Sequence, residues 1–596
     1  MKTLFLLLFT LLYSYQCHAE YRLIREEYEP ETNTWIEVSC IFGKLPAYGY
    51  APIRVKVNNG TAQDRSFTLN FSSKDGYSYN SEVNRVESQF RVQCPAGGFS
   101  QYDLTVPVNT VISSGTYDDE NKLEVTIITS GFPTKDGSME SSMPEEWPSV
   151  IMGNELFVVN ASRLDDHLNK SYLGSSRHGS VEFAGEFDPK VMPEDHRAYK
   201  GYEVIIMTAA EWKLLSPGAR LAILESNRLG SKLIIYTKQR SETLTSLQIA
   251  SPQDGAKSAL RSFGSVSIEN LPADNKLPLK NTASIVGDRA KAKETFYLSI
   301  VDDYLSNWPL EKVLGNKNFN IAFFIIILLI FGILVGPINL FVFAKKGKRH
   351  RLFITTPLIS LAASLLLIIT IIIQDGFGGK GHRLLLMEVR ADENKAYIIQ
   401  EQVSRTGVLL KNSFETSEST LISPVVLAQS RWTRVTDSYK SSNSYTVNLG
   451  KKGLKAEGDW FQSRSVHGHL LQTLRPSRGK ISLLNQSPSQ APTLTSSFDF
   501  DLDTVFYQDP DSVWWKSDTL PKAKPTAFKA SSREEFNLWF KKHQARFVKN
   551  QSDKMKLLTL QADRFYTFTP HAKATETYSG IKWLSTDTFL TGNLDK

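Results

Sequence analysis

The sequence predicts a multidomain fold that combines α/β and all-β units with a two-helix transmembrane hairpin. Two long apolar runs follow each other within residues 319–373, and regions of alternating apolar and polar residues lie on both sides of them. Another region places a capped helix between continuous apolar strands. A chain of 596 residues is long enough for several such units. We expect an N-terminal β-sandwich, an α/β domain, the hairpin and a C-terminal β-rich domain, in that order.

Residues 1–19 are typical of a signal peptide that is cleaved before Glu20. The segment has a basic start, and the small residues Cys17 and Ala19 occupy the −3 and −1 positions of a cleavage site. Its apolar run of about a dozen residues is too short for a stable span, which argues against an uncleaved anchor. The mature chain is therefore expected to be exported.

Cleavage leaves Cys40 and Cys94 as the only thiols. Thiols in an exported compartment tend to pair, so we expect a structural disulfide between them, worth about 4 kcal/mol. With no other cysteine, thiolate metal sites, iron–sulfur clusters and cysteine nucleophiles are excluded elsewhere in the mature chain. The charge balance, with a net charge of +7 and no basic stripe, does not indicate a nucleic-acid partner. No cofactor is expected.

The pattern of residues 20–135 predicts a β-sandwich, because apolar and polar residues alternate with the period of a half-buried strand. Packing two sheets face to face would bury the apolar positions. From Gly131 to Ser149 the chain is rich in Gly, Pro and Ser, which predicts a linker. The alternating apolar residues are Ile53, Val55, Val57, Phe67, Leu69, Phe71, Tyr102, Leu104, Val106, Leu123, Val125 and Ile127.

The sequence pattern of residues 145–300 predicts an α/β domain. The short apolar runs ELFVVN, YEVIIM and KLIIY suit strands that are buried on both faces of a parallel sheet. Between the last two, Ser216 can cap a helix that has Pro217 at its first position and ends at Gly230. Strand, capped helix and strand form a βαβ unit.

The stretch MPEDHRAYKGYEVIIMTAAEWKLLSPGARLAILESNRLGSKLIIY resembles the class I glutamine amidotransferase-like domains of bacterial envelope proteins. A β-sandwich precedes this stretch, and a hairpin containing Gly336-Pro337-Ile338-Asn339 and a second β domain follow it. This order of domains resembles that of a family of uncharacterised bacterial membrane proteins. Some members of that family resemble auxiliary components of ABC-type transport systems, including those linked to gliding. The resemblance implies an envelope protein with transporter-like partners.

The enzymatic part of this resemblance is not expected to hold. Amidotransferases need a cysteine on a strand-to-helix elbow with a nearby histidine, and this domain has no cysteine. The strand YEVIIM runs into Thr208-Ala209-Ala210, which lacks the glycines of an elbow. A Thr208 nucleophile served by His178 or His196 is the remaining enzymatic alternative. We expect no activity.

Residues 319–344 and 352–373 are predicted to be transmembrane helices, since each run can cross a hydrocarbon core of about 30 Å at a rise of about 1.5 Å per residue. Positive charge stays on the cytoplasmic side, so the loop 345–351 is expected in the cytoplasm and both flanks, 20–318 and 375–596, on the exported side of a bacterial inner membrane. The residues that set this topology are Lys345, Lys346, Lys348, Arg349 and Arg351.

Asn339 lies inside the first span, where an amide without a partner is costly. Its partner could be internal, from Thr355, Thr356 or Ser360 of the second span, or it could be a transmembrane helix of a transporter-like complex. Gly336 and Pro337 just before it can bend the helix or permit close helix approach. The three residues Gly336, Pro337 and Asn339 therefore predict a docking element within the hairpin.

Residues 380–596 predict an exported β-rich domain with a C-terminal helix. The segment Gly376–Gly381 matches G-x-G-x-x-G but follows a membrane helix, so we interpret it as a flexible exit linker. Asp499, Asp501 and Asp503 alternate with apolar residues and are assigned to an amphipathic strand. His467 and His469 could be metal ligands, but no third ligand is identifiable, and packed or exposed histidines are favoured.

The C-terminal helix starts at a capping box formed by Ser532 and Glu535. Phe536, Trp539 and Phe540 share one face of it. The helix packs on its own domain, or it docks on a partner or the membrane surface, and the sequence does not separate these readings.

Together these features predict a non-enzymatic, membrane-anchored envelope protein. Its partners would be the lipid bilayer and membrane or envelope proteins, and it could be an accessory component of a transport system. The alternatives are an exported sensor for a small ligand or glycan, and a divergent amidotransferase-like hydrolase.

Overall fold

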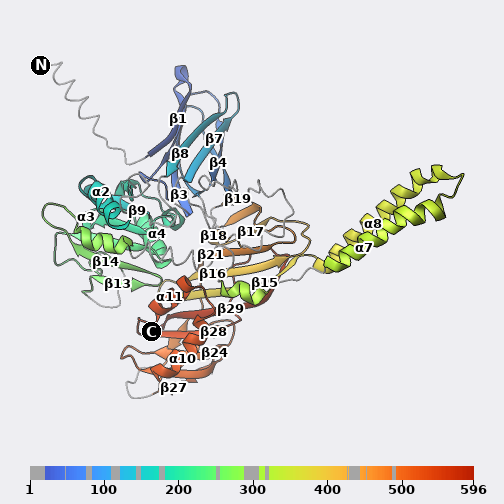
Figure 1. Cartoon of the computed structure of the whole chain (residues 1–596). Coiled ribbons are helices and arrows are strands. Elements are labelled where there is room, and N and C mark those ends of the chain that lie inside the picture. Colours follow the sequence, from blue (N-terminus) through green and yellow to red (C-terminus); the bar gives the residue numbers. More distant parts are fainter. Residues whose placement is uncertain are drawn as a thin grey trace.

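We describe a computed structural model of the chain (Figure 1). The predicted signal peptide, residues 1–19, and His178 lie outside the described part. The structure describes residues 21–46, 49–74, 84–108, 121–141, 149–173, 182–249, 255–287, 308–315, 321–425, 427, 443–450, 453–485 and 491–595.

The N-terminal region is a β-sandwich, as the alternating residues predicted. Residues from both sheets, among them Val38, Val55, Leu69 and Val125, pack into one core. The first sheet has the order β1 (Tyr21–Glu29), β2 (Thr34–Cys40), β3 (Gly49–Asn59) and β6 (Gly98–Val108), with the 3-10 turn η1 (Pro30–Thr32) between its first two strands. The second contains β5 (Arg85–Cys94), β4 (Arg65–Lys74), β7 (Asn121–Thr129) and β8 (Lys135–Ser141).

The linker prediction after Gly131 is wrong in part, because β8 forms there and pairs with β7. Its residues have weak strand character, and the strand rests on main-chain hydrogen bonds at a sheet edge and on Met139, which is 4% exposed. Residues 142–148 lie outside the described part.

The second sheet of the sandwich continues into the C-terminal half of the chain. Strand β5 pairs in parallel with β19 (Ser444–Leu449), which is followed by β20 (Leu454–Gly458) and β17 (Phe414–Thr416). The backbone N–H of Gln89 donates to the Asn448 side-chain oxygen at 3.0 Å. The sandwich and the C-terminal region therefore share one seven-stranded sheet.

The α/β unit has a six-stranded sheet in the order β10-β9-β11-β12-β14-β13, and only the edge strand β13 is antiparallel. Ser216 accepts a hydrogen bond from the Ala219 backbone at 3.1 Å, and Pro217 opens α4, so the predicted βαβ unit is confirmed. The strands are β9 (Val150–Gly153), β10 (Ala184–Phe187), β11 (Val204–Thr208), β12 (Lys232–Thr237), β13 (Ser258–Arg261) and β14 (Gly264–Asn270). The helices are α2 (Asn154–Leu168), η2 (Asn169–Leu173), η3 (Pro189–Val191), η4 (His196–Tyr199), α3 (Ala209–Leu214) and α4 (Pro217–Arg228).

The run ELFVVN was predicted to be a strand, and it is the first part of helix α2. Leu156, Asn160 and Leu164 are buried at helical spacing, while Val158 is 79% exposed. The strand is the preceding run, β9. A short apolar run fits either period, and here the packing of α2 against the sheet decides it.

The C-terminal region is built on a nine-stranded sheet with covered faces. Leu384 and Leu386 of β15 pack toward helices α10 and α11, while Leu385 and Met387 pack toward a small three-stranded sheet. The order is β18 (Ser419–Val425), β21 (Val466–Pro476), β16 (Lys395–Thr406), β15 (Gly379–Arg390), β29 (Ile581–Asn593), β28 (Arg564–Thr569), β24 (Leu502–Gln508), β25 (Trp514–Leu520) and β27 (Lys529–Ala530). The covering elements are α10 (Arg533–Gln544), α11 (Lys549–Leu558), β22 (Ile481–Leu483), β23 (Thr493–Ser496) and β26 (Thr526–Ala527).

The hairpin projects from this body as two helices that lie side by side (Figure 1). The first is α-helical in α7 (Ile321–Ile333) and continues as a π-helical segment, η5 (Leu334–Phe343). After the turn η6 (Arg349–Arg351), helix α8 (Leu352–Asp375) returns to the body. A short helix, α6 (Pro309–Leu314), packs on β15 and β16.

Candidate functional site

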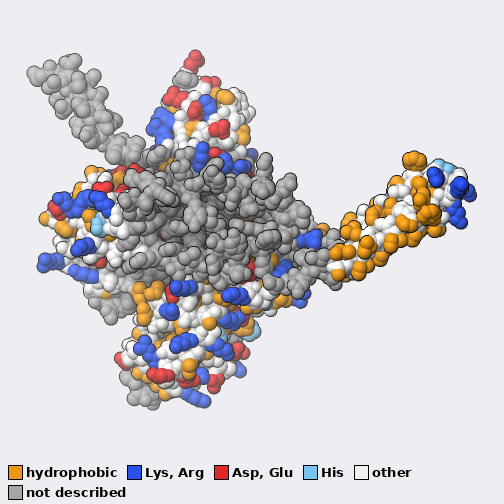
Figure 2. Space-filling view, viewed as in Figure 1, with side chains coloured by type: hydrophobic (Ala, Val, Ile, Leu, Met, Phe, Trp, Pro, Cys, Tyr) orange, Lys and Arg blue, Asp and Glu red, His pale blue; other side chains and the backbone are white. Residues whose placement is uncertain are grey.

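The hairpin has the length and surface of a membrane anchor. The two apolar windows, Ile325–Phe343 and Arg349–Thr370, are long enough to cross a membrane, and only 6% and 0% of them are buried inside the molecule. A core helix of a soluble domain would be mostly buried. Figure 2 shows the two helices covered by hydrophobic side chains, with a cluster of Lys and Arg at the tip.

The tip carries the basic residues predicted to set the topology. Lys345, Lys346, Lys348, Arg349 and Arg351 are all exposed in the turn between the two helices. The basic turn thus lies between two apolar helices that are long enough to cross a membrane, as the sequence predicts.

Asn339 is fully buried between the two helices, and its amide is satisfied inside the hairpin. Its Nδ2 donates to Thr356 Oγ1 at 2.9 Å, and its Oδ1 accepts from Thr355 Oγ1 at 2.6 Å. Of the two partners predicted for Asn339, the internal one is confirmed through these two threonines. The amide therefore fixes the register of the hairpin rather than offering itself to another protein.

Gly336 and Pro337 do not serve the contact between the two helices. A Cβ placed on Gly336 would meet no atom within 4 Å, so this glycine faces open space and not α8. Pro337 lies inside the π-helical segment. A proline has no N–H for the helical ladder, and the wider π turn is one way in which a helix accommodates such an interruption.

The segment after the second span is not a flexible linker, so that prediction is wrong. The Val408 backbone N–H donates to Gly376 at 2.9 Å, the Gly378 N–H donates to Val408 at 3.0 Å, and Gly379 already belongs to β15. The glycines allow this connection because Gly376 and Gly378 have φ values of 73° and 74°. Helix α8 is thus joined directly to the nine-stranded sheet.

The entry to the first span is held on the same strands. Trp308, which precedes α6, is fully buried and donates from Nε1 to Glu401 Oε2 at 2.7 Å. Arg405 of β16 donates to the Gly315 carbonyl at the end of α6. Burial raises the pKa of the Glu401 carboxyl to about 7, although the bond from Trp308 favours its charged form. The chain before the first span, as far as Gly315, and the chain after the second span are therefore both held on β15 and β16.

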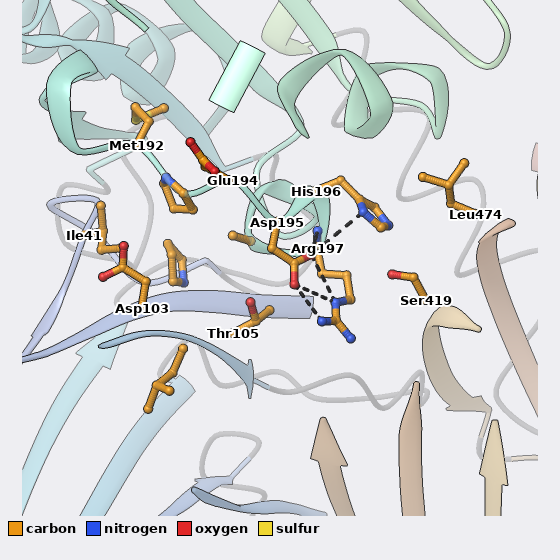
Figure 3. A pocket seen from close by; sticks show the side chains of 14 residues that line it. Ile41, Asp103, Thr105, Met192, Glu194, Asp195, His196, Arg197, Ser419 and Leu474 are labelled. Atoms are coloured by element: carbon orange, nitrogen blue, oxygen red, sulfur yellow. Dashed lines mark hydrogen bonds and ion pairs between the residues drawn. The ribbon is translucent and has the colours of Figure 1, made fainter. Parts of the chain in front are cut away.

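A cleft of about 850 Å³ lies where the three parts of the body meet (Figure 3). It is lined by Asp103 of the sandwich, by His196 and Arg197 of the α/β unit, and by Ser419 and Leu474 of the C-terminal region. The sequence did not identify this site, because its lining residues are distant in the chain and follow no motif.

Two nearly buried side chains of the cleft have an unsatisfied nitrogen. His196 Nε2 and Arg197 Nη1 have no hydrogen-bond partner among the described residues, although each side chain is only 7% exposed. Arg197 is held by Asp195 through Nη2 at 2.6 Å and Nε at 2.9 Å. Burial lowers the pKa of His196 to about 4, against the opposing effect of the Asp195 carboxylate.

Ion pairs connect the α/β unit to the C-terminal sheet beside this cleft. Lys395 pairs with Glu225 of α4, and Arg228 pairs with Glu393. On the other side, Arg54 of the sandwich donates to the Val191 carbonyl of the α/β unit at 3.0 Å. The three parts are therefore connected by polar contacts as well as by the shared sheet.

Thr208 is engaged as a helix cap. Its hydroxyl donates to Glu155 Oε2 at 2.9 Å and accepts from the Glu211 backbone at 3.1 Å, in a capping box at the start of α3. His196, its proposed base, instead lies near the carboxylates of Asp195 and Glu225, at 3.8 and 3.7 Å from Nδ1. Within the described residues, His196 is therefore not placed as a base for Thr208, and His178 lies outside them.

The predicted disulfide is wrong in this structure, where Cys40 and Cys94 are both buried and are not bonded to each other. Cys40 lies opposite Ile53 on β3, whereas the Cys94 thiol contacts the Val57 carbonyl four residues further along β3. Four residues of a strand span roughly 13 Å, and a disulfide needs Cα atoms within about 7 Å. The two cysteines share a core but not a position along it.

The histidine pair belongs to a packed aromatic cluster. His469 is 1% exposed and its Nε2 contacts the Trp460 carbonyl at 3.0 Å, and His467 contacts the Gln462 carbonyl. The ring of Phe461 lies 4.8 Å from that of His469. Within the described residues, no group of three or more potential ligands is placed to hold a metal.

The acidic strand prediction is wrong for its first half. Strand β24 begins only at Leu502, so Asp499 and Asp501 precede it and Asp503 lies within it. Asp501 instead accepts a hydrogen bond from the Lys522 backbone at 2.7 Å. Phe498 is buried beneath this turn, which explains the apolar alternation.

The C-terminal aromatic helix packs on its own domain. Phe536 and Phe540 are 2% and 6% exposed, and the ring of Trp514 stacks 4.1 Å from that of Phe536. Trp539 packs against the same core. Ser532 caps the helix by accepting from the Glu535 backbone at 3.1 Å, as predicted. The Glu535 carboxylate, predicted to complete a capping box, instead accepts from Lys516 at 2.8 Å and from the Ser531 hydroxyl at 2.7 Å. The alternative in which these aromatics dock elsewhere is therefore wrong.

Comparisons with known proteins leave the family open. No family model matches the chain, and no curated protein does. Among solved structures, the sporulation control protein Spo0M from Bacillus subtilis is 20% identical over 18% of this chain and 47% of its own, with a TM-score of 0.13. The chain thus spans less than half the length of Spo0M.

Two further solved structures show equally distant likeness. The yeast delta-COP-I mu-homology domain, complexed with a Dsl1 WxWxV peptide, is 10% identical over 36% of this chain and 96% of its own, with a TM-score of 0.15. A beta-glucuronidase of Bacteroides uniformis is 8% identical over 34% of this chain and 33% of its own, also with a TM-score of 0.15. At these scores the likeness carries no argument about function.

Proposed function

We propose that this chain is a non-enzymatic scaffold of the bacterial envelope, anchored in the inner membrane by its hairpin, with both large flanks on the exported side. It would bind or organise membrane or envelope proteins, as an accessory component of a transport system would. The observation that carries this proposal is the rigid mounting of the hairpin. The second leg is fixed on β15 and β16 through Gly376–Gly379, and the chain that leads to the first leg is held on the same two strands as far as Gly315, through Trp308–Glu401 and Arg405.

A rigid mounting suits a scaffold because it fixes the orientation of the body relative to the bilayer. A catalytic or ligand-binding domain that works alone needs only a flexible tether. The body is itself connected as one piece, through the β5–β19 pairing and through the ion pairs of Glu225 and Glu393. Partners held by different parts of this body would keep a defined distance and angle.

The α/β unit, in this proposal, is an amidotransferase-like fold that has no glutaminase activity. The residues of the resemblance form the parallel strands and the capped helix α4, while Thr208 is committed to its helix cap. Thr208→Ala should cost about 1 kcal/mol of stability through the lost cap, with no change in glutamine-dependent ammonia release from the purified protein. Release that is present in the wild type and absent in Thr208→Ala would refute this assignment.

The topology is tested by labelling single cysteines in whole cells with a membrane-impermeant maleimide. Glu457→Cys, on an exposed strand of the body, should react without permeabilisation, and Lys348→Cys at the tip should react only after it. The native thiols are fully buried and provide little background. The opposite pattern would overturn the exported location.

The scaffold function is tested by co-purification from native membranes. The wild type is compared with a variant that has a flexible Gly-Ser linker inserted between Asp375, the last residue of α8, and Gly376, so that the hairpin and β15 are kept and only the rigid connection between them is lost. We expect both proteins to insert and the variant to retain fewer partners. An unchanged set of partners would show that the mounting has no role in assembly.

A second candidate function is the binding of a small polar ligand in the three-way cleft. It is favoured by the unpaired nitrogens of His196 and Arg197. No Phe, Tyr or Trp side chain is among the described residues that line the cleft, which argues against a glycan because sugars are commonly held on the faces of these rings. Thermal unfolding with a panel of small carboxylates and phosphates, in the wild type and in Arg197→Lys, tests this alternative. A ligand that stabilises only the wild type would support it.

A further inference from the structure

Exposed apolar side chains and several lysines lie at the point where the hairpin joins the body. Val313 and Phe377 are each 63% exposed, and Leu410 is 89% exposed. Phe377 pairs with Val408 in an isolated β-bridge, which brings Leu410 close to the end of α8. We call this set, together with Lys312, Lys380, Lys411 and Lys582, the base surface.

The position of the apolar residues relative to the membrane follows from the hairpin. Helix α8 has 24 residues, so it is roughly 36 Å long and passes completely through a hydrocarbon core of about 30 Å. Phe377 lies two residues beyond its end, within roughly 7 Å. With the helix centred on the core, its end lies roughly 3 Å beyond the hydrocarbon and Phe377 at most roughly 10 Å beyond it. Since the headgroup layer on each side is roughly 5 to 8 Å thick, Phe377 and the adjacent Leu410 lie at its outer edge.

The cations form a row at the same level of the sheet. Lys380 of β15 is the register partner of both Arg405 on β16 and Lys582 on β29. Like charges directly across neighbouring strands destabilise a sheet unless an anion compensates them. Within the described part of the chain, no carboxylate forms an ion pair with Lys380, Lys411 or Lys582. The Glu311 carboxylate of α6 acts electrostatically on Arg405, so an anion from outside the chain is expected only at the three lysines.

We propose that the base surface is a lipid-binding site, which inserts Phe377 and Leu410 into the headgroup layer and binds anionic phospholipid through Lys380, Lys411 and Lys582. Apolar side chains flanked by lysines are the composition of protein surfaces that lie in a membrane interface. This inference rests on the proposed membrane anchorage. If the base surface binds lipid, the body lies against the bilayer and the nine-stranded sheet is held at a defined tilt to it.

Lipid contact can be measured with an environment-sensitive fluorophore at single positions of the full chain in proteoliposomes. The fluorophore is attached to Leu410→Cys, and brominated phosphatidylcholine serves as the quencher. Leu538→Cys is the matched control, because Leu538 is 74% exposed on α10. Leu361→Cys in the middle of α8 reports insertion of the hairpin itself. We expect quenching at 361 and 410 and none at 538.

The outcomes separate this inference from the proposed function. Quenching at 361 but not at 410 would overturn the inference and leave the anchorage in place. Absence of quenching at 361 would overturn the anchorage. A blue-shifted fluorophore at 410 that bromine does not quench would show that protein covers the base surface, which also overturns the inference.

The charge part of the inference has its own test. Brominated phosphatidylglycerol should quench the fluorophore at 410 several-fold more than the phosphatidylcholine form does, since each surface lysine favours anionic lipid about fivefold. In the triple variant Lys380→Gln, Lys411→Gln and Lys582→Gln, the ratio should fall to about one. Equal quenching by the two lipids in the unmutated background would overturn the selectivity for anionic lipid.

Discussion

Replacing Glu401 by Gln is expected to stabilise the protein above about pH 7. Glu401 is 1% exposed, and burial raises the pKa of its carboxyl to about 7, even though the Trp308 indole and the Val548 backbone favour the ionised form. An unfolded glutamate has a pKa of about 4.3. The difference of roughly 2.7 pKa units corresponds to about 3 to 4 kcal/mol of native-state destabilisation once the carboxyl is ionised.

The direction of the pH dependence follows from the raised pKa. Between about pH 4.3 and about pH 7 the native state holds a proton on Glu401 that the unfolded chain has lost. The free energy of unfolding therefore falls as the pH rises through this window. Gln carries no charge and can still accept the bond from Trp308 Nε1, so Glu401→Gln should lack this fall and be more stable by about 3 kcal/mol at the alkaline end.

The assay is denaturant unfolding of the full chain in detergent micelles, followed by tryptophan fluorescence from about pH 5 to about pH 8. Glu457→Gln, an exposed glutamate on β20, is the matched control and should keep the pH slope of the wild type. If Glu401→Gln and the wild type showed the same slope, the raised pKa and the reasoning from burial would both be refuted.

Three further predictions concern buried polar groups. Asn339→Leu should leave membrane insertion intact and weaken the pairing of the two helices by about 1 kcal/mol. Protease resistance of the hairpin in bilayers measures this pairing, and unchanged resistance would contradict the role of the Asn339 hydrogen bonds. Thiol titration of the non-reduced protein should find Cys40 and Cys94 unreactive when folded and both reactive in denaturant, whereas no reaction in denaturant would indicate a bridge. Arg564→Ala should destabilise the C-terminal region by about 3 to 5 kcal/mol in a denaturation experiment, because it removes the ion-pair partner of the fully buried Glu388 and leaves it only the longer-range charges of Arg390 and Arg228. A loss below about 1 kcal/mol would show that Glu388 is protonated or hydrated in the variant.

Much of the architecture was predictable because it depends on local periodicity. The alternating residues of the sandwich, the cap at Ser216 and the cap at Ser532 each depend on a few neighbouring residues, and all of them appear as expected. The prediction failed at ELFVVN, where a short apolar run fits both a strand and a helix. It also failed at Gly376–Gly381, because glycines that permit an unusual φ cannot be told from glycines that confer flexibility.

The candidate site was predictable only where the relevant residues lie close in sequence. The internal partner of Asn339 was among the predicted alternatives because a hairpin brings the two spans together with known polarity. The cleft around His196 and Arg197, and the Trp308–Glu401 contact, join residues from distant segments that have no shared motif. Nothing in a single sequence indicates such neighbours.

By itself, the sequence determined the two apolar spans, the basic turn between them and the strand or helix character of most segments, since hydropathy and period are properties of short stretches. The tertiary structure alone decided which distant segments meet. It paired β5 with β19, left Cys40 and Cys94 apart on a shared core, and turned the C-terminal aromatic helix onto its own sheet. The physical reason is that these outcomes depend on how whole elements pack to bury their apolar faces. The local sequence shows that a face is apolar and must be buried, but it does not show which distant element covers that face.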